Sequence, residues 1–498
     1  MAGESVGWAD YENIANAGGL FVDGADLVGG ESSVGDVDAL NKALAAGSSI
    51  DNPGASAGEG FPLRTESLDA ALVVTTYKAN EAKFWQMLYK DAAYNTVEEY
   101  NRLEAYGSGD AAFIGEGDLP SEDDSTYSRN YVRIKFMGTT RRVTHVMSLL
   151  RTAHGPAVAR EVNNGTLWLI RQLERKLFVG DESLVPIEFD GLEKLMITAF
   201  GATRSEDDQF LGYEDTTNVF DLRGAPLSED HITDLTEKLQ SEPNFGTPSD
   251  LWMPPSITKD LSKILYPKER YDIPAPSGGK AGIAINGIKT PFGDINFDVD
   301  KFIPQSDLAS DDGVGKAGIR PTPPTVGTPT SPAYAGVNAT FFDGDWAGTY
   351  IYKVVAGSRY GRSAPATSSA IAVAAADQVS LPVSDNGPST TYYEVYRTAA
   401  GGAAATARSI MRVRRTGVSQ TIVDLNRFLP GCNKAYMLTQ SNEVLKWKQL
   451  APFTKINLAT IDTSIRWMQV LYGALQFMQP RKCGMFINVG PLATGMNA

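Results

Sequence analysis

The feature that most constrains the fold of this 498-residue chain is one long predicted helix, which spans residues 155–180. Pro156 stands where a proline is tolerated in the first turn, and Gly180 stands where a left-handed residue would end the helix. Apolar side chains recur at the helical period and form one broad stripe, made up of Val158, Val162, Leu169, Ile170, Leu173 and Leu177. Leu167 and Trp168 lie off this stripe. Such a helix spans about 35 Å, and we expect it to pack against neighbours on two sides.

The negative charge of the chain is concentrated near its start. The net charge is −14, and residues 1–60 hold ten acidic side chains against Lys42 alone, a net charge of −9. The remainder is nearly balanced, which argues against a DNA-binding protein with a basic surface. Cys432 and Cys483 are far apart, so no disulfide framework is indicated and a reducing compartment is expected. The sequence shows neither a secretory signal nor a stretch of about 20 apolar residues that could span a membrane.

The first part of the chain cannot build a core by itself. Residues 1–66 are rich in Gly, Ala, Ser and Asp and poor in large apolar side chains, so we predict an N-terminal arm, either disordered or laid across a neighbouring chain. The composition changes at residues 67–94, where Phe84, Trp85 and Leu88 form an amphipathic pattern. This second stretch is predicted to start the core.

Residues 95–142 have the pattern of a projection rather than of a compact domain. An outgoing stretch leads to a tip rich in Gly, Asp and Ser. The returning stretch alternates side chains with a period of two, setting Tyr131, Arg133 and Lys135 against Val132, Ile134 and Phe136. This alternation predicts a half-exposed strand. A two-stranded extension has no core of its own and needs a partner surface. The alternative is an ordinary disordered loop.

The middle of the chain has a mixed pattern. Residues 143–228 hold the long helix, a short apolar turn and a polar, acidic stretch. Within residues 229–318 we predict a short helix at 231–239, then a buried strand end and another helix in 251–265, and β structure over 278–302. A Pro/Thr-rich linker of the semi-rigid kind follows.

Residues 319–440 have a different residue pattern from the preceding part of the chain. Alternating Tyr/Val strands are separated by Gly/Ser/Pro turns at short spacing, which is typical of a small β-sandwich. Residues 350–366 resemble the central hairpin of fibronectin type III and related immunoglobulin-like domains, and the lack of a spanning cysteine pair favours the fibronectin-like variety. Residues 441–498 are again dense in apolar and aromatic side chains and must complete a core begun earlier. We therefore predict that the sandwich is an insertion.

The sequence lacks motifs for catalysis or metal binding. The histidines lie outside any such motif, at positions His145, His154 and His231. The nearest approach to a phosphate loop, Gly313–Gly318, lacks the first glycine and the Ser/Thr after Lys316. Runs of acidic residues are expected to be solvated faces. We expect no enzymatic activity, no cofactor and no bound metal.

The order of these parts resembles the major capsid protein of tailed bacteriophages, which has the Hong Kong 97-type fold. Two stretches carry the resemblance: the sequence FVGDESLVPIEFDGLEKL at 178–195, and residues 450–482, in which LYGAL followed by PRK is fairly specific. In particular, the chain resembles the capsid proteins of those large contractile-tailed phages in which the capsid protein carries an immunoglobulin-like insertion. The likeness covers about residues 67–302 and 446–489 in order, and the arm and the sandwich match only in type.

The resemblance implies an α+β fold of the Hong Kong 97 type with an inserted all-β sandwich of the immunoglobulin or fibronectin type III kind. It assigns the parts as an N-terminal arm (1–66), the start of the core (67–94), an extended loop (95–142), a peripheral domain (143–228) with a spine helix (155–180), an axial domain (229–318), the insertion (319–440) and the return to the core (441–498). Such proteins often lose an N-terminal propeptide, so either no cleavage occurs here or the arm is retained.

The function implied by the resemblance is structural. Copies of the chain would self-assemble into hexamers and pentamers of an icosahedral phage head that encloses double-stranded DNA through non-specific contacts, without a membrane. Assembly would take place in the cytoplasm of the host bacterium, with portal and scaffold proteins as partners and a cement protein as an open alternative. The side chains expected at assembly interfaces are Leu167, Trp168, Tyr131, Arg133, Lys135, Arg141 and Arg142.

Two other functions stay open on the sequence alone. A phage tail or baseplate protein would share the accessory domain, but this hypothesis does not account for the long helix or for the apolar residues 441–498 that complete an earlier core. An exported multidomain binding protein or hydrolase with a fibronectin-like module would need a signal and a site, and the sequence shows neither.

Overall fold

The computed structural model describes residues 76–107, 113–117, 119, 122–150, 152, 155–199, 203–204, 210–211, 218–269, 285–304, 319–334, 340–387, 389–459 and 462–492. The predicted arm at 1–66, the loop at 313–318 and His154 lie outside these residues. The described residues belong to one unit, Val74–Ala498. None of the helices among them is long and apolar enough to cross a membrane.

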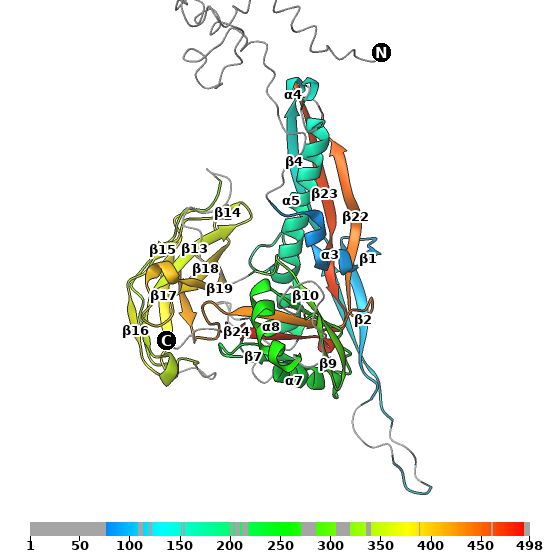
Figure 1. Cartoon of the computed structure of the whole chain (residues 1–498), viewed down its shortest axis with the longest axis vertical. Coiled ribbons are helices and arrows are strands. Elements are labelled where there is room, and N and C mark those ends of the chain that lie inside the picture. The colour runs from blue at the N-terminus through cyan, green and yellow to red at the C-terminus, as the bar shows by residue number, and fades with distance from the viewer. Residues whose placement is uncertain are drawn as a thin grey trace, which may run out of the picture. The chain divides into compact units, whose positions relative to one another are not determined.

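The long predicted helix is α5, Ala157–Val179, and it runs along a four-stranded sheet (Figure 1). The sheet has the order β1–β22–β23–β4, with bounds Tyr89–Ala92, Leu445–Asn457, Ser464–Phe477 and Lys135–Thr144. β1 is parallel to β22, and the other neighbours are antiparallel. Hydrogen bonds from Lys448 and Lys446 lower the pKa of Asp91 to about 2 and tie β1 to β22. Strands that are far apart in the sequence therefore share one sheet, as the apolar composition of residues 441–498 predicts.

The apolar stripe of α5 faces the core. Leu169, Leu173 and Leu177 are buried on it. Gly165, a poor helix former, has a packing role, because a Cβ atom there would overlap the side chain of Gln469 on β23. The Gln469 amide donates to the carbonyl of Val162 at 2.7 Å, so helix and strand approach closely at this glycine.

The prediction that Gly180 ends the helix in a left-handed conformation is wrong. The residue ends α5, but its φ is −58°, so it is not left-handed. A Cβ atom at this position would overlap the carbonyl oxygen of Phe189 and would lie 2.7 Å from that of Lys176. Glycine is needed because the chain after α5 folds back against the helix end, where Gly191 donates its N–H to the Gly180 carbonyl at 2.9 Å.

The chain enters the core through two short helices, η2 (Ala79–Glu81) and α3 (Lys83–Met87). Phe84 and Trp85 on α3 are buried, as the amphipathic pattern predicts. The ring of Phe84 packs 4.9 Å from that of Phe178 on α5, and Trp85 packs edge-on at 5.1 Å against Trp447 on β22. Aromatic packing thus joins α3 to both the helix and the sheet.

A second, six-stranded sheet has the order β7–β24–β21–β8–β10–β9, with bounds Val219–Asp221, Gly484–Val489, Asn433–Leu438, Asp250–Met253, Gly293–Val299 and Gly287–Thr290. Three helices belong to the same region of the chain, α6 (Leu192–Ala199), α7 (Glu229–Gln240) and α8 (Pro255–Glu269). The helix predicted at 231–239 is confirmed, as are the buried strand end and the following helix that were predicted within 251–265. One boundary is corrected: the insertion does not extend to residue 440, because β21 pairs with β24 and β8 of this sheet.

The described residues of the inserted region are all-β apart from two single-turn helices, η3 (Gly344–Trp346) and η4 (Ala404–Thr406). One sheet holds β11 (Thr325–Val326), β17 (Val379–Ser384) and β20 (Ser419–Asp424). A second holds β13 (Tyr352–Ser358), β14 (Gly361–Arg362), β15 (Ala366–Thr367), β18 (Tyr392–Arg397) and β19 (Arg408–Arg414). β12 (Gly348–Tyr350) pairs with β16 (Ile371–Val373).

A buried ion pair joins the two larger sheets of the insertion. Arg397 on β18 is fully buried and contacts Asp424 on β20 at 2.5 Å. Asp424 also accepts a hydrogen bond from the Tyr352 hydroxyl at 2.9 Å. The ion pair and this hydrogen bond link the two sheets directly, while the Nε atom of Arg397 is buried without a hydrogen-bond partner among the described residues.

Candidate assembly interface

A two-stranded hairpin, Val97–Arg133, projects from the four-stranded sheet (Figure 1). β2 (Val97–Ala105) pairs with β3 (Thr126–Arg133), and these two strands pair with no others among the described residues. The hairpin is anchored where Tyr100 donates to the carbonyl of Phe477 at 3.1 Å and Arg102 donates to that of Met478 at 2.8 Å. Both acceptors lie at the end of β23. The predicted paired projection is therefore present, although its last predicted residues belong to β4 of the sheet.

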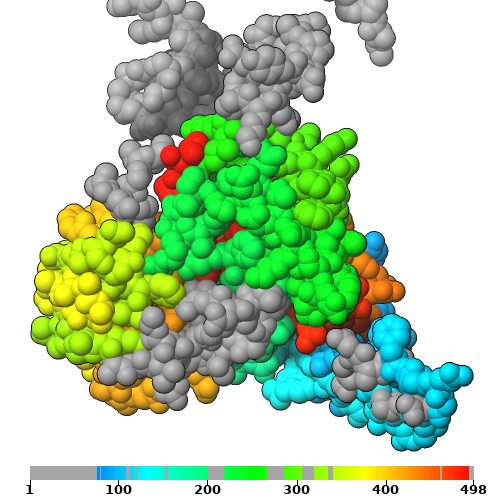
Figure 2. Space-filling model, turned by 90° about the horizontal axis from the view of Figure 1, so that it is seen from below, coloured from blue at the N-terminus to red at the C-terminus, as the bar shows by residue number. Residues whose placement is uncertain are grey.

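The hairpin exposes large apolar side chains to solvent. Tyr127 is 71% exposed and Tyr131 is 60% exposed, and further exposed side chains on the same projection are Leu103, Tyr106, Phe113, Ile114 and Leu119. Figure 2 shows the hairpin, in cyan, protruding from the molecular surface. Two strands cannot bury these side chains against each other, and exposed apolar surface of this extent marks an interaction site.

Tyr131, Arg133 and Lys135 come together at the base of the hairpin. Arg133 forms an ion pair with Glu182 at 3.1 Å and lies 5.4 Å over the Tyr131 ring. Lys135 contacts the same Glu182 at 2.9 Å and donates to the carbonyl of Pro186 at 2.6 Å. These cations hold the hairpin base to the turn after α5, and Lys135 is mostly buried within its own chain. Tyr131 is 60% exposed and the Arg133 side chain is 54% exposed, so these two members of the set face solvent.

Arg141 and Arg142 lie on opposite faces of β4, far along the strand from Lys135. Arg141 faces α5 and pairs with Glu161 at 3.4 Å. Arg142 faces away from α5 and pairs with Asp462 at 3.6 Å, with more than half of its side chain exposed. Hydrogen bonds from Ser464 and Arg466, together with the charges of Arg466 and Arg142, lower the pKa of Asp462.

Leu167 and Trp168 occupy the second face of α5. The carbonyl of Leu167 accepts a hydrogen bond from the Tyr77 hydroxyl at 3.1 Å, so the stretch leading into the core lies on this face. Arg171, one turn further along, lies 5.6 Å from the Tyr77 ring. Trp168 keeps 39% of its surface exposed. This second face is therefore partly covered within the chain and partly open.

The structure reveals a second exposed apolar surface, which the sequence patterns did not predict. α4 (His145–Leu149) follows β4, and Figure 1 shows it at the opposite end of the sheet from the hairpin. Its apolar side chains are exposed, with Leu149 at 72%; the set, here called the α4 patch, is Val146, Met147, Leu149 and Leu150. The sequence feature that could have indicated this patch is the run VMSLL at 146–150, in which no charged residue interrupts the apolar side chains.

The described residues offer little for catalysis. They contain no group of three or more His, Cys, Asp or Glu side chains that could hold a metal ion. His231 caps the start of α7 by sharing hydrogen bonds with Ser228, which is a structural role. Burial raises the pKa of the Cys483 thiol to about 12, so this cysteine is a poor nucleophile at neutral pH.

A comparison with protein families finds a match over residues 55–312, about half of the chain. The matching family model is described as SU10 major capsid protein.

Curated proteins give matches over most of the chain. The major capsid protein of Staphylococcus phage S25-3 is 24% identical over 445 residues, which cover 86% of this chain and 91% of that protein. The major capsid protein of Staphylococcus phage K is similar to the same extent. Among solved structures, the capsid of a native GTA particle covers 88% of this chain at 9% identity with a TM-score of 0.44, and 99% of that chain is covered. The capsid of Myoviridae phage XM1 covers 85% of this chain and 96% of its own at 7% identity, with a TM-score of 0.40.

Proposed function

The chain belongs to the SU10 major capsid protein family, and from this premise we propose that its copies form hexamers and pentamers that close an icosahedral shell around the double-stranded DNA of a tailed phage. It is a structural protein of the phage head and not an enzyme. We propose that it assembles in the cytoplasm of the host bacterium, with portal and scaffold proteins as partners. The tail-protein and exported-protein alternatives have no support from the family match.

We further propose roles for the parts of the chain within the Hong Kong 97-type plan. The hairpin is the extended loop, α5 is the spine helix of the peripheral domain, and the six-stranded sheet with its helices builds the axial domain. The all-β insertion, of immunoglobulin or fibronectin type III kind, decorates the outer surface. Residues 441–498 support this assignment, because their strands β22 and β23 complete the sheet beneath α5 and their strand β24 completes the six-stranded sheet.

The observation that carries the proposal is the presence of two unlike apolar surfaces on one chain. The hairpin and the α4 patch lie at opposite ends of the four-stranded sheet and differ in form, one a ribbon and the other a short helix. Contacts between unlike surfaces of identical chains are heterologous, and such contacts generate closed rings when the rotation between copies closes. A ring of copies therefore accounts for surfaces that a lone subunit leaves solvated.

A double substitution on the hairpin tests this proposal. We expect Tyr127→Asp/Tyr131→Asp to abolish assembly, because it replaces the two exposed aromatic rings of β3 with carboxylates. The subunit itself should stay folded, since both side chains are exposed and substitutions at such sites change stability by about 0.5 kcal/mol or less. Sedimentation velocity separates assembled from unassembled protein, and circular dichroism reports the fold.

Tyr360→Asp provides the matched control. Tyr360 is a partly exposed tyrosine of the insertion, far in sequence from the hairpin. We expect this variant to assemble as the unmodified chain does. Normal assembly of the hairpin double variant would remove the hairpin from the proposed interface.

A further inference from the structure

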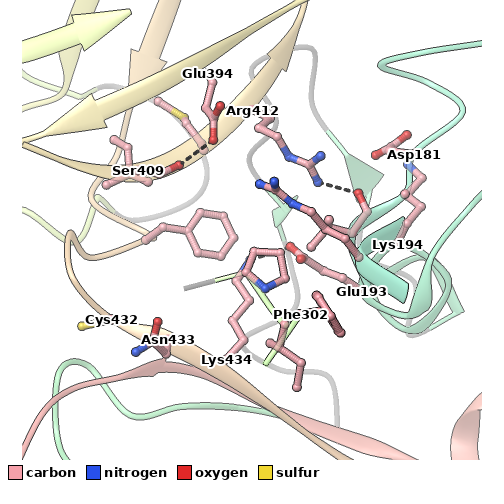
Figure 3. A pocket seen from close by; sticks show the side chains of 18 of the residues that line it. Asp181, Glu193, Lys194, Phe302, Glu394, Ser409, Arg412, Cys432, Asn433 and Lys434 are labelled. Atoms are coloured by element: carbon pink, nitrogen blue, oxygen red, sulfur yellow. Dashed lines mark hydrogen bonds and ion pairs between the residues drawn. The ribbon is translucent and has the colours of Figure 1, made fainter. Parts of the chain in front are cut away.

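The cavity between the core and the all-β insertion is a polar junction within one chain. Its volume is about 570 Å³, and its walls come from α5, α6, β18 and β19. Figure 3 shows Arg412 of β19 donating to the carbonyl of Val179 on α5 at 2.8 Å. Within the insertion, Glu394 accepts a hydrogen bond from Ser409 at 3.3 Å and pairs with Arg362 at 2.9 Å. These contacts join the insertion to the core.

An outward-facing aromatic side chain lies in the turn after α7. Phe245 is 64% exposed, and its φ of 49° lies in the left-handed region. This region is sterically unfavourable for a bulky side chain and is usually occupied by glycine or asparagine. Since most of the residue's surface faces solvent, packing within the described chain does not account for a phenylalanine there. Backbone strain of this kind is concentrated at functional sites.

The turn holds Phe245 in a fixed position. Its neighbour Asn244 is buried and donates its side-chain N–H to the Asn218 side chain at 3.0 Å. On the other side, a Cβ atom on Gly246 would lie 2.9 Å from the Cα atom of Lys482, so the backbone of the turn rests directly on that residue. A side chain displayed from a fixed backbone loses less conformational freedom when it binds.

A second exposed aromatic side chain lies beside the same end of α7. Phe292 stands in the turn between β9 and β10 and is 37% exposed. The side-chain amide of Gln240, the last residue of α7, donates to the Phe292 carbonyl at 2.6 Å. Phe245 and Phe292 are here called the α7 knob. Aromatic side chains of this kind are enriched among the residues that dominate protein interfaces.

The α7 knob lies close to the base of the hairpin. Lys482, on which the turn of Phe245 rests, is the last residue of η5 (Pro480–Lys482). The carbonyl of Met478, four residues earlier, accepts the hydrogen bond from Arg102 that anchors the hairpin. Four residues span at most about 15 Å. A neighbouring molecule that covers the base of the hairpin can therefore reach the α7 knob as well.

We propose that the α7 knob is an apolar anchor that contacts a second copy of this chain. The proposal rests on the proposed assembly, and it extends the interface from the base of the hairpin to the end of α7. A second copy is the partner because the chain belongs to a major capsid protein family and the knob continues the surface assigned to contacts between copies. Burial of the two rings in that contact removes them from water. It also accounts for a phenylalanine where glycine or asparagine would be less strained.

The variant Phe245→Asn tests the proposal. Asparagine tolerates the left-handed region, so the substitution removes the ring without adding strain. We expect the concentration at which the full-length protein associates to rise by about tenfold or more, because the burial of one phenylalanine is lost. The denaturant midpoint of the unassembled subunit should not fall. Sedimentation velocity over a concentration series measures association, and denaturant unfolding at low concentration measures the midpoint.

Ala376→Asn is the matched control. Ala376 is an exposed residue of the insertion with a φ of 66°, so the same change is made at a left-handed position that carries no ring. This variant should associate as the unmodified chain does. Unchanged association of Phe245→Asn, or a loss that only accompanies a lower midpoint, would overturn the knob contact and leave the proposed shell intact. An unmodified chain that stays monomeric would instead overturn the assembly and the knob contact together.

Discussion

Leu173→Asp is expected to prevent the formation of stable, soluble subunits and, with it, all assembly. Leu173 lies on the buried stripe of α5 and has no exposed surface. Truncation of a core leucine costs about 2–5 kcal/mol, and an unpaired carboxylate adds the cost of removing a polar group from water. Domains have a total stability of only about 5–15 kcal/mol, so this single change can exhaust it. The fraction of soluble protein and its denaturant midpoint measure the effect.

Asn163→Asp on the same helix is the matched control. Asn163 is exposed, so the new charge stays hydrated and should change the midpoint little. A Leu173→Asp protein that is soluble, as stable as the unmodified chain and able to assemble would show that the buried stripe of α5 does not hold the core together.

The second large effect concerns a buried pair of carboxyl groups. Glu174 on α5 is fully buried and accepts the backbone N–H groups of Phe84 at 2.7 Å and Trp85 at 2.9 Å, so it caps the start of α3 from another helix. Asp300, also buried, lies beside it, and one Asp300 oxygen lacks a donor among the described residues. Burial, reinforced by Asp300, raises the pKa of Glu174 to about 9. A proton kept on Glu174 supplies the missing donor.

This proton makes stability depend on pH, and the sign follows from the shift. The pKa of Glu174 is higher in the folded chain, at about 9, than its ordinary value of 4.5. Between these two values the folded state holds a proton that the unfolded state releases. The contribution of Glu174 to the free energy of unfolding is therefore greatest below pH 4.5. It falls as the pH rises towards 9 and levels off above that value. The slope is of the order of 1 kcal/mol per pH unit.

Glu174→Gln should flatten this dependence between about pH 5 and 8. The amide keeps a donor for Asp300 and an acceptor for one of the two α3 N–H groups, but it does not titrate. Glu161→Gln, a partly exposed substitution on the same helix, should leave the slope unchanged. Denaturant unfolding at several pH values gives the slope for each protein. Equal slopes for the unmodified chain and Glu174→Gln would show that Glu174 is not the group responsible.

Patterns with a regular period proved informative. The 3.6-residue stripe predicts α5, and period-2 alternation predicts the strand that returns from the hairpin. The dense apolar composition of residues 441–498 predicts that the chain completes an earlier core, which β22, β23 and β24 do. In each case the signal is local and repeated, so one sequence suffices to detect it.

Features that depend on contacts between distant residues could not be predicted. The close approach that requires Gly165 is set by Gln469, and the cap on α3 is supplied by Glu174, about 90 residues away. The α4 patch has too short a run to show a period. The cavity brings α5 and α6 together with β18 and β19, elements more than 190 residues apart, so its charge cannot be read along the chain.

Copies of this chain should close into a shell through surfaces that each subunit contains. Electron microscopy of the purified full-length protein at high concentration tests this expectation most directly. We predict closed angular shells in which hexameric and pentameric rings are visible, and we predict that the hairpin double variant yields none. Isolated particles at every concentration, or open tubes without pentameric vertices, would contradict this expectation.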